Sequence, residues 1–317
     1  MLKIAQYTES IANLVGLAQE AEQNKNNLQA KKYFQRALEL DQPFELVQRY
    51  FDFLQRSQDF AEARQLLADF EQEFLRNGQL TDYWQKLWLI ADYVVLDQSY
   101  QRLQYQHYQF SAVEKKQWQS LQQQLATVVT EPDKIAQLTA NLLQAATTKT
   151  GGNAAVVLAK MQSLTPDAYV QVAQPTLASP TLNPEVRVKL LDEISLFSAT
   201  YSLILSWRGE SRLLTTDQLT PLQYVPELEQ FAVDFAQAQF DQTPDTVDQQ
   251  LAMSNLLTYI LLTYPFCEQE LQPHEIWRQF LSKGQIPATA NAKEVKELSY
   301  WQEQERNLLN NLNAQAV

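Results

Sequence analysis

The chain has 317 residues, of which 45% are hydrophobic, so it is long enough for two domains or for one extended array of repeats. Only 6 residues are glycine, which argues against sheet-rich folds and phosphate-binding loops, because both need glycine in tight turns. The formal net charge of −12 argues against nonspecific nucleic-acid binding, which depends on Lys and Arg side chains that neutralise phosphates.

The cysteine count and the apolar segments bear on the compartment. Cys267 is the only cysteine, so no intramolecular disulfide can form, which is typical of a reducing compartment. The first residues lack the apolar run of a signal peptide. The most apolar segment, residues 251–266, is shorter than the roughly 20 residues that a membrane helix needs. We therefore expect a cytoplasmic protein with no membrane partner.

Residues 11–74 contain two similar helix pairs. Small and large apolar residues recur at an interval of 33 positions: Ala30, Phe34 and Ala37 in the first pair, and Ala63, Leu67 and Phe70 in the second. Small residues let paired helices approach closely, and large ones fill the space beside them. Such a pair cannot bury its apolar face without stacked neighbours, so the pattern predicts a helical repeat.

Two segments allow the repeat to be named. Residues 31–41 (KKYFQRALELD) resemble the second helix and exit turn of a tetratricopeptide repeat, and residues 59–67 (DFAEARQLL) resemble the entry to the next such helix. The interval is close to the period of that family, which is roughly 34 residues. Ala18 and Phe51 stand where the family has a small glycine, and residues 83–110 read as a degenerate third unit. We expect a bacterial member of this family.

The resemblance implies a curved stack whose concave face is formed by the first helix of each unit and binds a peptide or a partner helix. Carried over by position, that face presents Gln19, Glu22, Gln23, Gln48, Arg49, Asp52, Gln55 and Arg56. Arg49 and Arg56 suit an acidic partner, because a guanidinium makes bidentate contacts with carboxylates.

The second half of the chain is also predicted to be helical. Helix starts are indicated where a capping residue precedes proline, at Thr165-Pro166, Asn183-Pro184, Thr220-Pro221 and Thr243-Pro244. Further helices are expected over 226–240, 244–264, 273–283 and 292–312. Residues 201–215 break this pattern and predict a β-hairpin, which is either a connector or an exposed edge that captures an extended peptide.

Residues suited to catalysis are few. His107 and His274 lack neighbours at metal-ligand spacing, and Cys267 follows an apolar helix, so a buried structural thiol is expected. No nucleophile elbow, phosphate loop or dinucleotide fingerprint occurs. We predict a protein that is not an enzyme and has no metal site and no cofactor.

Together these features predict an all-α protein. A tetratricopeptide-like superhelix over 1–128 is followed by a helical domain over 129–317 with one small β-hairpin. The expected function is a scaffold or adaptor that binds a protein or peptide partner, with no nucleic-acid partner. The alternative is a peptide-sensing regulator that resembles bacterial tetratricopeptide phosphatases or pheromone receptors. The oligomeric state stays open.

Overall fold

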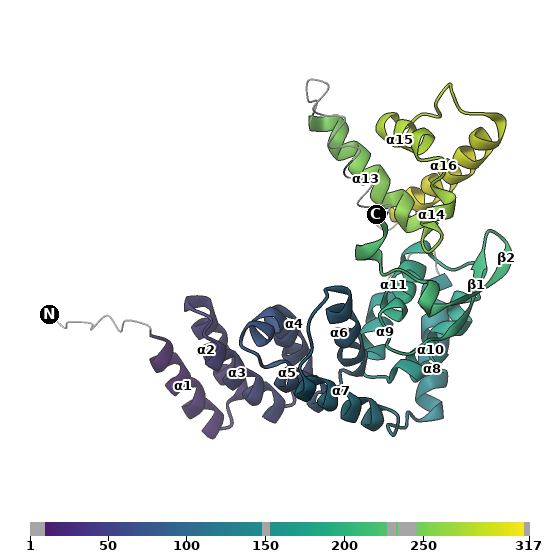
Figure 1. Cartoon of the computed structure of the whole chain (residues 1–317). Coiled ribbons are helices and arrows are strands. Elements are labelled where there is room, and N and C mark those ends of the chain that lie inside the picture. The colour runs from purple at the N-terminus through teal and green to yellow at the C-terminus, as the bar shows by residue number, and fades with distance from the viewer. Residues whose placement is uncertain (1–9, 148–152, 227–232, 234–245, 314–317) are drawn as a thin grey trace. The chain divides into compact units, whose positions relative to one another are not determined.

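The computed structural model describes residues 10–147, 153–226, 233 and 246–313, and within them the chain is helical apart from one two-stranded hairpin (Figure 1). The predicted all-α class with a small β-hairpin is confirmed. The chain forms two compact units. Unit 1 comprises Met1–Leu96 and Tyr108–Thr127, and unit 2 comprises Asp97–His107 and Val128–Val317.

Unit 1 is a row of helices that pack mainly on near neighbours in the sequence (Figure 1). Its helices are α1 (Ile11–Gln23), α2 (Asn27–Leu40), α3 (Phe44–Arg56), α4 (Phe60–Arg76), α5 (Leu80–Leu89), the start of α6 (Tyr93–Tyr105) and α7 (Ala112–Leu125). Helices α1 to α5 pack in succession, and α7 packs on α5. The unit is therefore a helical array with short-range packing.

The core of unit 1 follows the predicted alternation of small and large residues. Ala30, Ala37 and Ala63 are completely enclosed, and the ring of Phe34 lies between those of Tyr50 and Phe53, at centroid distances of 5.3 Å to each. Alanine at the closest approach lets two helices touch backbone to backbone, while the rings fill the wider spaces beside them. The same residues thus set both the spacing and the order of the helices.

The turn after each first helix has the same geometry in all three helix pairs of unit 1. Lys25, Gln58 and Ala91, which are evenly spaced in the sequence, adopt left-handed backbone conformations, with φ of 59°, 60° and 51°. The next residue closes each turn by donating its N–H to a carbonyl five positions back: Asn26 to Ala21 at 2.8 Å, Asp59 to Leu54 at 3.0 Å, and Asp92 to Leu87 at 2.9 Å. This is the Schellman arrangement that ends many helices. The third helix pair, which reads as degenerate from sequence, therefore keeps the turn of the other two pairs.

Unit 2 contains more varied elements. Its helices after residue 128 are α8 (Pro132–Thr147), α9 (Ala154–Met161), α10 (Pro166–Leu177), α11 (Pro184–Ser195), α13 (Thr246–Thr263), α14 (Cys267–Glu270), α15 (His274–Lys283) and α16 (Ala292–Asn313). The predicted caps Thr165 and Asn183 accept hydrogen bonds from the first turns of α10 and α11. At Thr220-Pro221 the structure has only a short 3-10 turn over Leu222–Tyr224. The helix expected over 226–240 and the cap at Thr243 lie outside the described residues, apart from two positions.

The predicted hairpin consists of β1 (Ser202–Trp207) and β2 (Glu210–Thr215). Both residues of its connecting turn, Arg208 and Gly209, have positive φ, of 51° and 84°, which is typical of a type I′ turn. The hairpin packs on α10, and the side-chain amide of Gln174 both donates to the Ile204 carbonyl and accepts from the Ile204 N–H, at 2.9 and 3.1 Å. The outer edge of β1 is therefore covered at Ile204 by this side chain.

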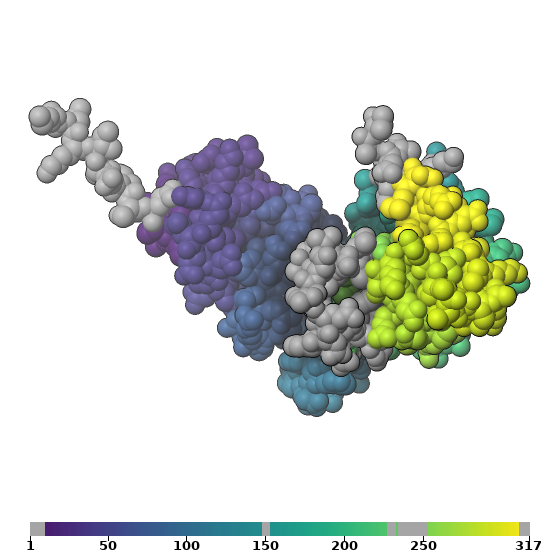
Figure 2. All heavy atoms as spheres, turned by 90° about the horizontal axis from the view of Figure 1, so that it is seen from above, coloured from purple at the N-terminus to yellow at the C-terminus, as the bar shows by residue number. Residues whose placement is uncertain are grey.

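The C-terminal helices of unit 2 pack around α13, which contacts both α15 and α16. The ring of Tyr259 lies 5.2 Å from that of Trp277 and 5.3 Å from that of Phe280. In the space-filling view the atoms of α15 and α16, yellow-green and yellow, form one continuous surface (Figure 2). Cys267 is buried, as predicted. No described helix is long and apolar enough to cross a membrane.

Candidate protein-binding surface

The residues proposed from sequence as a binding surface lie on α1 and α3. Gln19, Glu22 and Gln23 are on α1, and Gln48, Arg49, Asp52, Gln55 and Arg56 are on α3. Together with Asp82 and Lys86 of α5, these residues are named the first-helix surface here. Their side chains connect the three helices in a regular way.

Three polar contacts on the first-helix surface join residues that are 34 positions apart. Arg56 donates from Nε and Nη2 to the two carboxylate oxygens of Glu22, at 2.8 and 3.2 Å. Gln48 donates to Asp82 at 3.4 Å, and Nζ of Lys86 lies 3.7 Å from Asp52. Each first helix therefore faces the next first helix at the same register. An equal offset along three helices is what a repeating stack produces.

Lys86 is the most enclosed charged group of this surface, with 10% of its side chain exposed. Its ammonium lies 4.6 Å from the ring centroid of Phe51 and 3.6 Å from Asp82 of its own helix, as well as near Asp52. An aromatic face and two carboxylates compensate the charge that burial takes out of water. Lys86 was not predicted from the sequence.

The remaining residues of the first-helix surface are open to a partner. Gln19, Gln23 and Arg49 are exposed and Gln55 is half-buried, and none of the four makes a side-chain hydrogen bond or ion pair within the described part of the chain. Arg56 was expected to be available to an acidic partner, but its guanidinium is engaged by Glu22. Arg49 is the arginine of the proposed pair that makes no ion pair within the described part of the chain.

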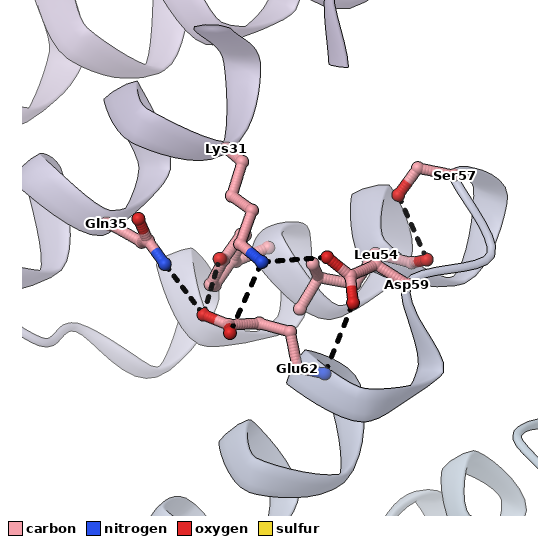
Figure 3. A network of polar contacts seen from close by, with 7 residues as sticks. Lys31, Gln35, Leu54, Ser57, Asp59 and Glu62 are labelled. Carbon is pink, nitrogen blue, oxygen red and sulfur yellow. Dashed lines mark hydrogen bonds and ion pairs between the residues drawn. The ribbon is translucent and has the colours of Figure 1, made fainter. Parts of the chain in front are cut away.

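A second polar network ties the second helices together (Figure 3). Lys31 of α2 reaches the α4 cap Asp59 at 2.8 Å and Glu62 at 3.4 Å. Glu62 also accepts from Gln35 at 2.8 Å and from the hydroxyl of Tyr50 at 3.0 Å. The arrangement recurs one helix pair later, where Arg64 of α4 lies 3.6 Å from Asp92 and donates to the Ile90 carbonyl at 3.2 Å.

The charges of this network shift one another. The hydrogen bond with Asp59 raises the pKa of Lys31, and the same bond lowers the pKa of the Asp59 carboxyl. Burial acts to raise the pKa of Glu62, but the hydrogen bonds from Gln35 and Tyr50 and the charge of Lys31 outweigh it and lower that pKa. The network holds its ionised form because every charge has a partner.

Unit 2 holds a contrasting set of carboxyl groups, of which Asp97 is buried and Asp192 and Glu193 are half-buried. Burial raises the pKa values of Asp97, Asp192 and Glu193. Each accepts hydrogen bonds that join separate segments: Asp97 from Ser198, Asp192 from the N–H of Leu222, and Glu193 from the hydroxyl of Tyr169 at 2.6 Å. These partners explain the burial of the three groups as structural links. Among the described residues, no group of three or more His, Cys, Asp or Glu side chains is placed to hold a metal ion.

Comparisons with protein-family models, with curated proteins and with solved structures find no match to this chain. What the first-helix surface can bind therefore follows from its own geometry.

Proposed function

We propose that the chain is a non-enzymatic scaffold of the tetratricopeptide-like kind, which binds a protein or peptide partner on the first-helix surface of unit 1. The observation that supports this is the constant 34-residue offset of the side-chain contacts between α1, α3 and α5. A stack with a constant offset presents equivalent side chains in a line, and an extended peptide or a helix can contact several of them at once.

The chemistry of the surface defines the partner further. Glu22, Asp52 and Asp82 already have cations beside them, whereas Arg49 makes no ion pair within the described part of the chain. The exposed amides of Gln19 and Gln23 offer both donors and acceptors. We therefore expect a polar peptide or helix that places a carboxylate opposite Arg49 and uses the glutamines for further hydrogen bonds.

The experiment selects peptides from a displayed random library on the whole protein and measures the affinity of the best binders by titration. Arg49→Glu is the test variant, because it reverses the one charge expected to meet the partner. Lys32→Glu is the matched control, because Lys32 is an exposed cation of the second helix α2, outside the first-helix surface, and makes no ion pair within the described part of the chain. Arg56 is left unchanged, because its reversal would place two carboxylates against each other at Glu22.

Selected peptides should contain an acidic residue, and Arg49→Glu should weaken binding by about three- to tenfold, since an exposed ion pair contributes about 0.2–1 kcal/mol and its reversal adds repulsion. Lys32→Glu should leave the affinity unchanged. Peptides that bind both variants as tightly as the original protein would show that the first-helix surface is not the binding site.

A further inference from the structure

Unit 2 contains an open polar pocket of about 590 Å³ that is separate from the surface proposed above. Its wall is formed by the segment 179–184, the first turn of α11, the hairpin turn and one face of α16, with Arg187 and Arg208 among its residues. Among the described residues, the wall contains no Asp or Glu, although the chain has 37 acidic residues against 25 Lys and Arg. An acidic protein thus keeps one cavity free of carboxylates and lines it with two guanidinium groups.

Arg187 is the central residue of this pocket. Its guanidinium lies over the ring of Trp207, 4.7 Å from the centroid, and its Nη2 donates to the carbonyls of Leu261 and Leu262 at 3.2 and 2.6 Å. Its Nε is buried and has no hydrogen-bond acceptor, and Nη1 makes no hydrogen bond within the described part of the chain. No carboxylate lies within ion-pair distance of Arg187 there.

The two carbonyls account for only part of this arrangement. Leu261 and Leu262 belong to the last turn of α13, so Arg187 caps that helix and faces the negative end of its dipole. Nη2 is thereby satisfied, Nε is enclosed without an acceptor, and Nη1 is the nitrogen left to donate to a ligand in the pocket. A buried guanidinium is normally paired with an anion, because removal of its charge from water is costly. Burial also lowers the pKa of Arg187 to about 10.

The neighbouring groups favour an anion from outside the chain. Arg187 lies in the first turns of α11, a helix of 12 residues whose N-terminus carries partial positive charge and opens on the same pocket. Arg208 is less available, because Glu270 and Glu297 lie 3.1 and 3.0 Å from its Nη1. Glu185 is an opposing charge in the first turn of α11, but its side chain is exposed and does not line the pocket.

We propose that this pocket binds a small phosphorylated molecule, whose phosphate accepts hydrogen bonds from Arg187 at the N-terminal end of α11. The hydroxyl and amide groups of Ser179, Thr181, Gln304 and Asn307 are suited to the polar body of such a ligand. A volume of about 590 Å³ lies within the range of small-molecule sites. This inference concerns unit 2 and does not depend on the scaffold function.

The probes are inorganic phosphate, ribose 5-phosphate and ribose, each titrated calorimetrically into the whole protein at constant ionic strength. The main variant is Gln304→Glu/Asn307→Asp, which adds two carboxylates to the wall with almost no change in shape and leaves the contacts of Arg187 intact. Its matched control is Gln104→Glu/Gln106→Glu, which adds the same charges to exposed positions at the end of α6, outside the pocket. Arg187→Lys keeps the charge but removes the planar fork.

Ribose 5-phosphate should bind more tightly than about 1 mM, and ribose should not bind measurably. Gln304→Glu/Asn307→Asp should weaken binding at least tenfold and Arg187→Lys several-fold, while the control pair has no effect. Binding of inorganic phosphate alone, with the same variant dependence, would support the phosphate site and exclude the sugar contacts. No binding of either phosphate, or equal binding by the original protein and Gln304→Glu/Asn307→Asp, would overturn the proposal.

Discussion

Several charged side chains of units 1 and 2 have different kinds of contact partner. In unit 1, Lys31 meets Asp59 and Arg56 meets Glu22 at partly exposed positions, each between consecutive units of the array. In unit 2, the buried Asp97 and the half-buried Glu193 accept hydrogen bonds from neutral groups, while Arg187 is stacked on a ring and donates to carbonyls. These three groups of unit 2 are surrounded by dipoles, although Arg208 of the same unit is paired with Glu270 and Glu297.

The two units also differ in which contacts define the packing of their segments. In unit 1 the polar links repeat, so one local pattern, used once per helix pair, defines each junction. In unit 2 each link occurs once and joins segments that are far apart in sequence, such as Asp97 with Ser198 and Arg187 with Leu262. Loss of one link should therefore lower the free energy of unfolding less in unit 1 than in unit 2.

The largest effect is expected for Trp207→Ala. Trp207 is 2% exposed and contacts Phe266, Trp301 and Arg187, so its removal leaves a cavity and an uncovered guanidinium. We expect a loss of about 3–5 kcal/mol in the free energy of unfolding, measured by urea denaturation. Leu213→Ala, on the exposed face of the same hairpin, is the control and should change stability little. Equal effects of the two substitutions would contradict the assignment of Trp207 to the core.

Next in size is the series of substitutions at the repeated turn, Asn26→Ala, Asp59→Ala and Asp92→Ala. Loss of a helix cap costs about 0.5–2 kcal/mol. Asp92 should show the largest loss, because it is buried beside Arg64, and Asn26 the smallest, because it is exposed and has no ion pair. Chemical denaturation at neutral pH measures the series. An inverted order would show that the ion pair of Asp92 with Arg64 adds no stability beyond that of the helix cap.

The two units should also respond to pH in opposite directions. The folded pKa values of Asp59 and Glu62 lie below their ordinary values of 3.8 and 4.5, so these groups stabilise the fold above those values and lose that contribution as the pH falls below them. The folded pKa of Glu193 lies above 4.5, so its contribution is most favourable below that pH and declines as the pH rises through it.

Matched amide substitutions measure this difference. The stability gap between the original protein and Asp59→Asn should widen between about pH 3 and pH 6, whereas the gap to Glu193→Gln should narrow over the same interval. Urea denaturation at each pH gives both gaps. Parallel curves for the two variants would contradict the contrast between paired and buried carboxyl groups.

The smallest effect is expected for the link between Glu22 and Arg56. Because 58% of the Arg56 side chain is exposed, the coupling of Glu22→Gln with Arg56→Gln should be below about 1 kcal/mol in a double-mutant cycle. A markedly larger coupling would mean that the first-helix surface itself holds the array together.

Much of the fold could be predicted because its signals are local. The proline-preceded caps at Thr165 and Asn183, the Ala30 and Ala63 repeat, and the turn at Arg208 and Gly209 are short patterns with a direct physical meaning. The helix expected after Thr220-Pro221 was wrong as far as the structure describes it, since only a 3-10 turn forms before residue 226.

The site was harder to predict, because its contacts depend on the register between helices. Glu22 and Arg56 were both proposed from sequence, but their pairing follows from the offset of α1 against α3, which no local pattern reports. The third turn at Ala91 could have been found by extending the repeat interval by one more helix pair, whereas the same interval aligns Lys86 with the buried Phe53 and gives no signal for it. Arg187 gave no signal, since its neighbours come from α13 and β1.

The left-handed turns at Lys25 and Gln58 have an evolutionary consequence. Residues 26–58 begin and end at the same backbone geometry, and they carry their own cap, Asn26, and their own cation, Lys31. A tandem duplication of residues 26–58 should therefore keep the order and register of the helices, and add one helix pair to the array. Unequal recombination at these two turns would let relatives of this chain change length by whole helix pairs.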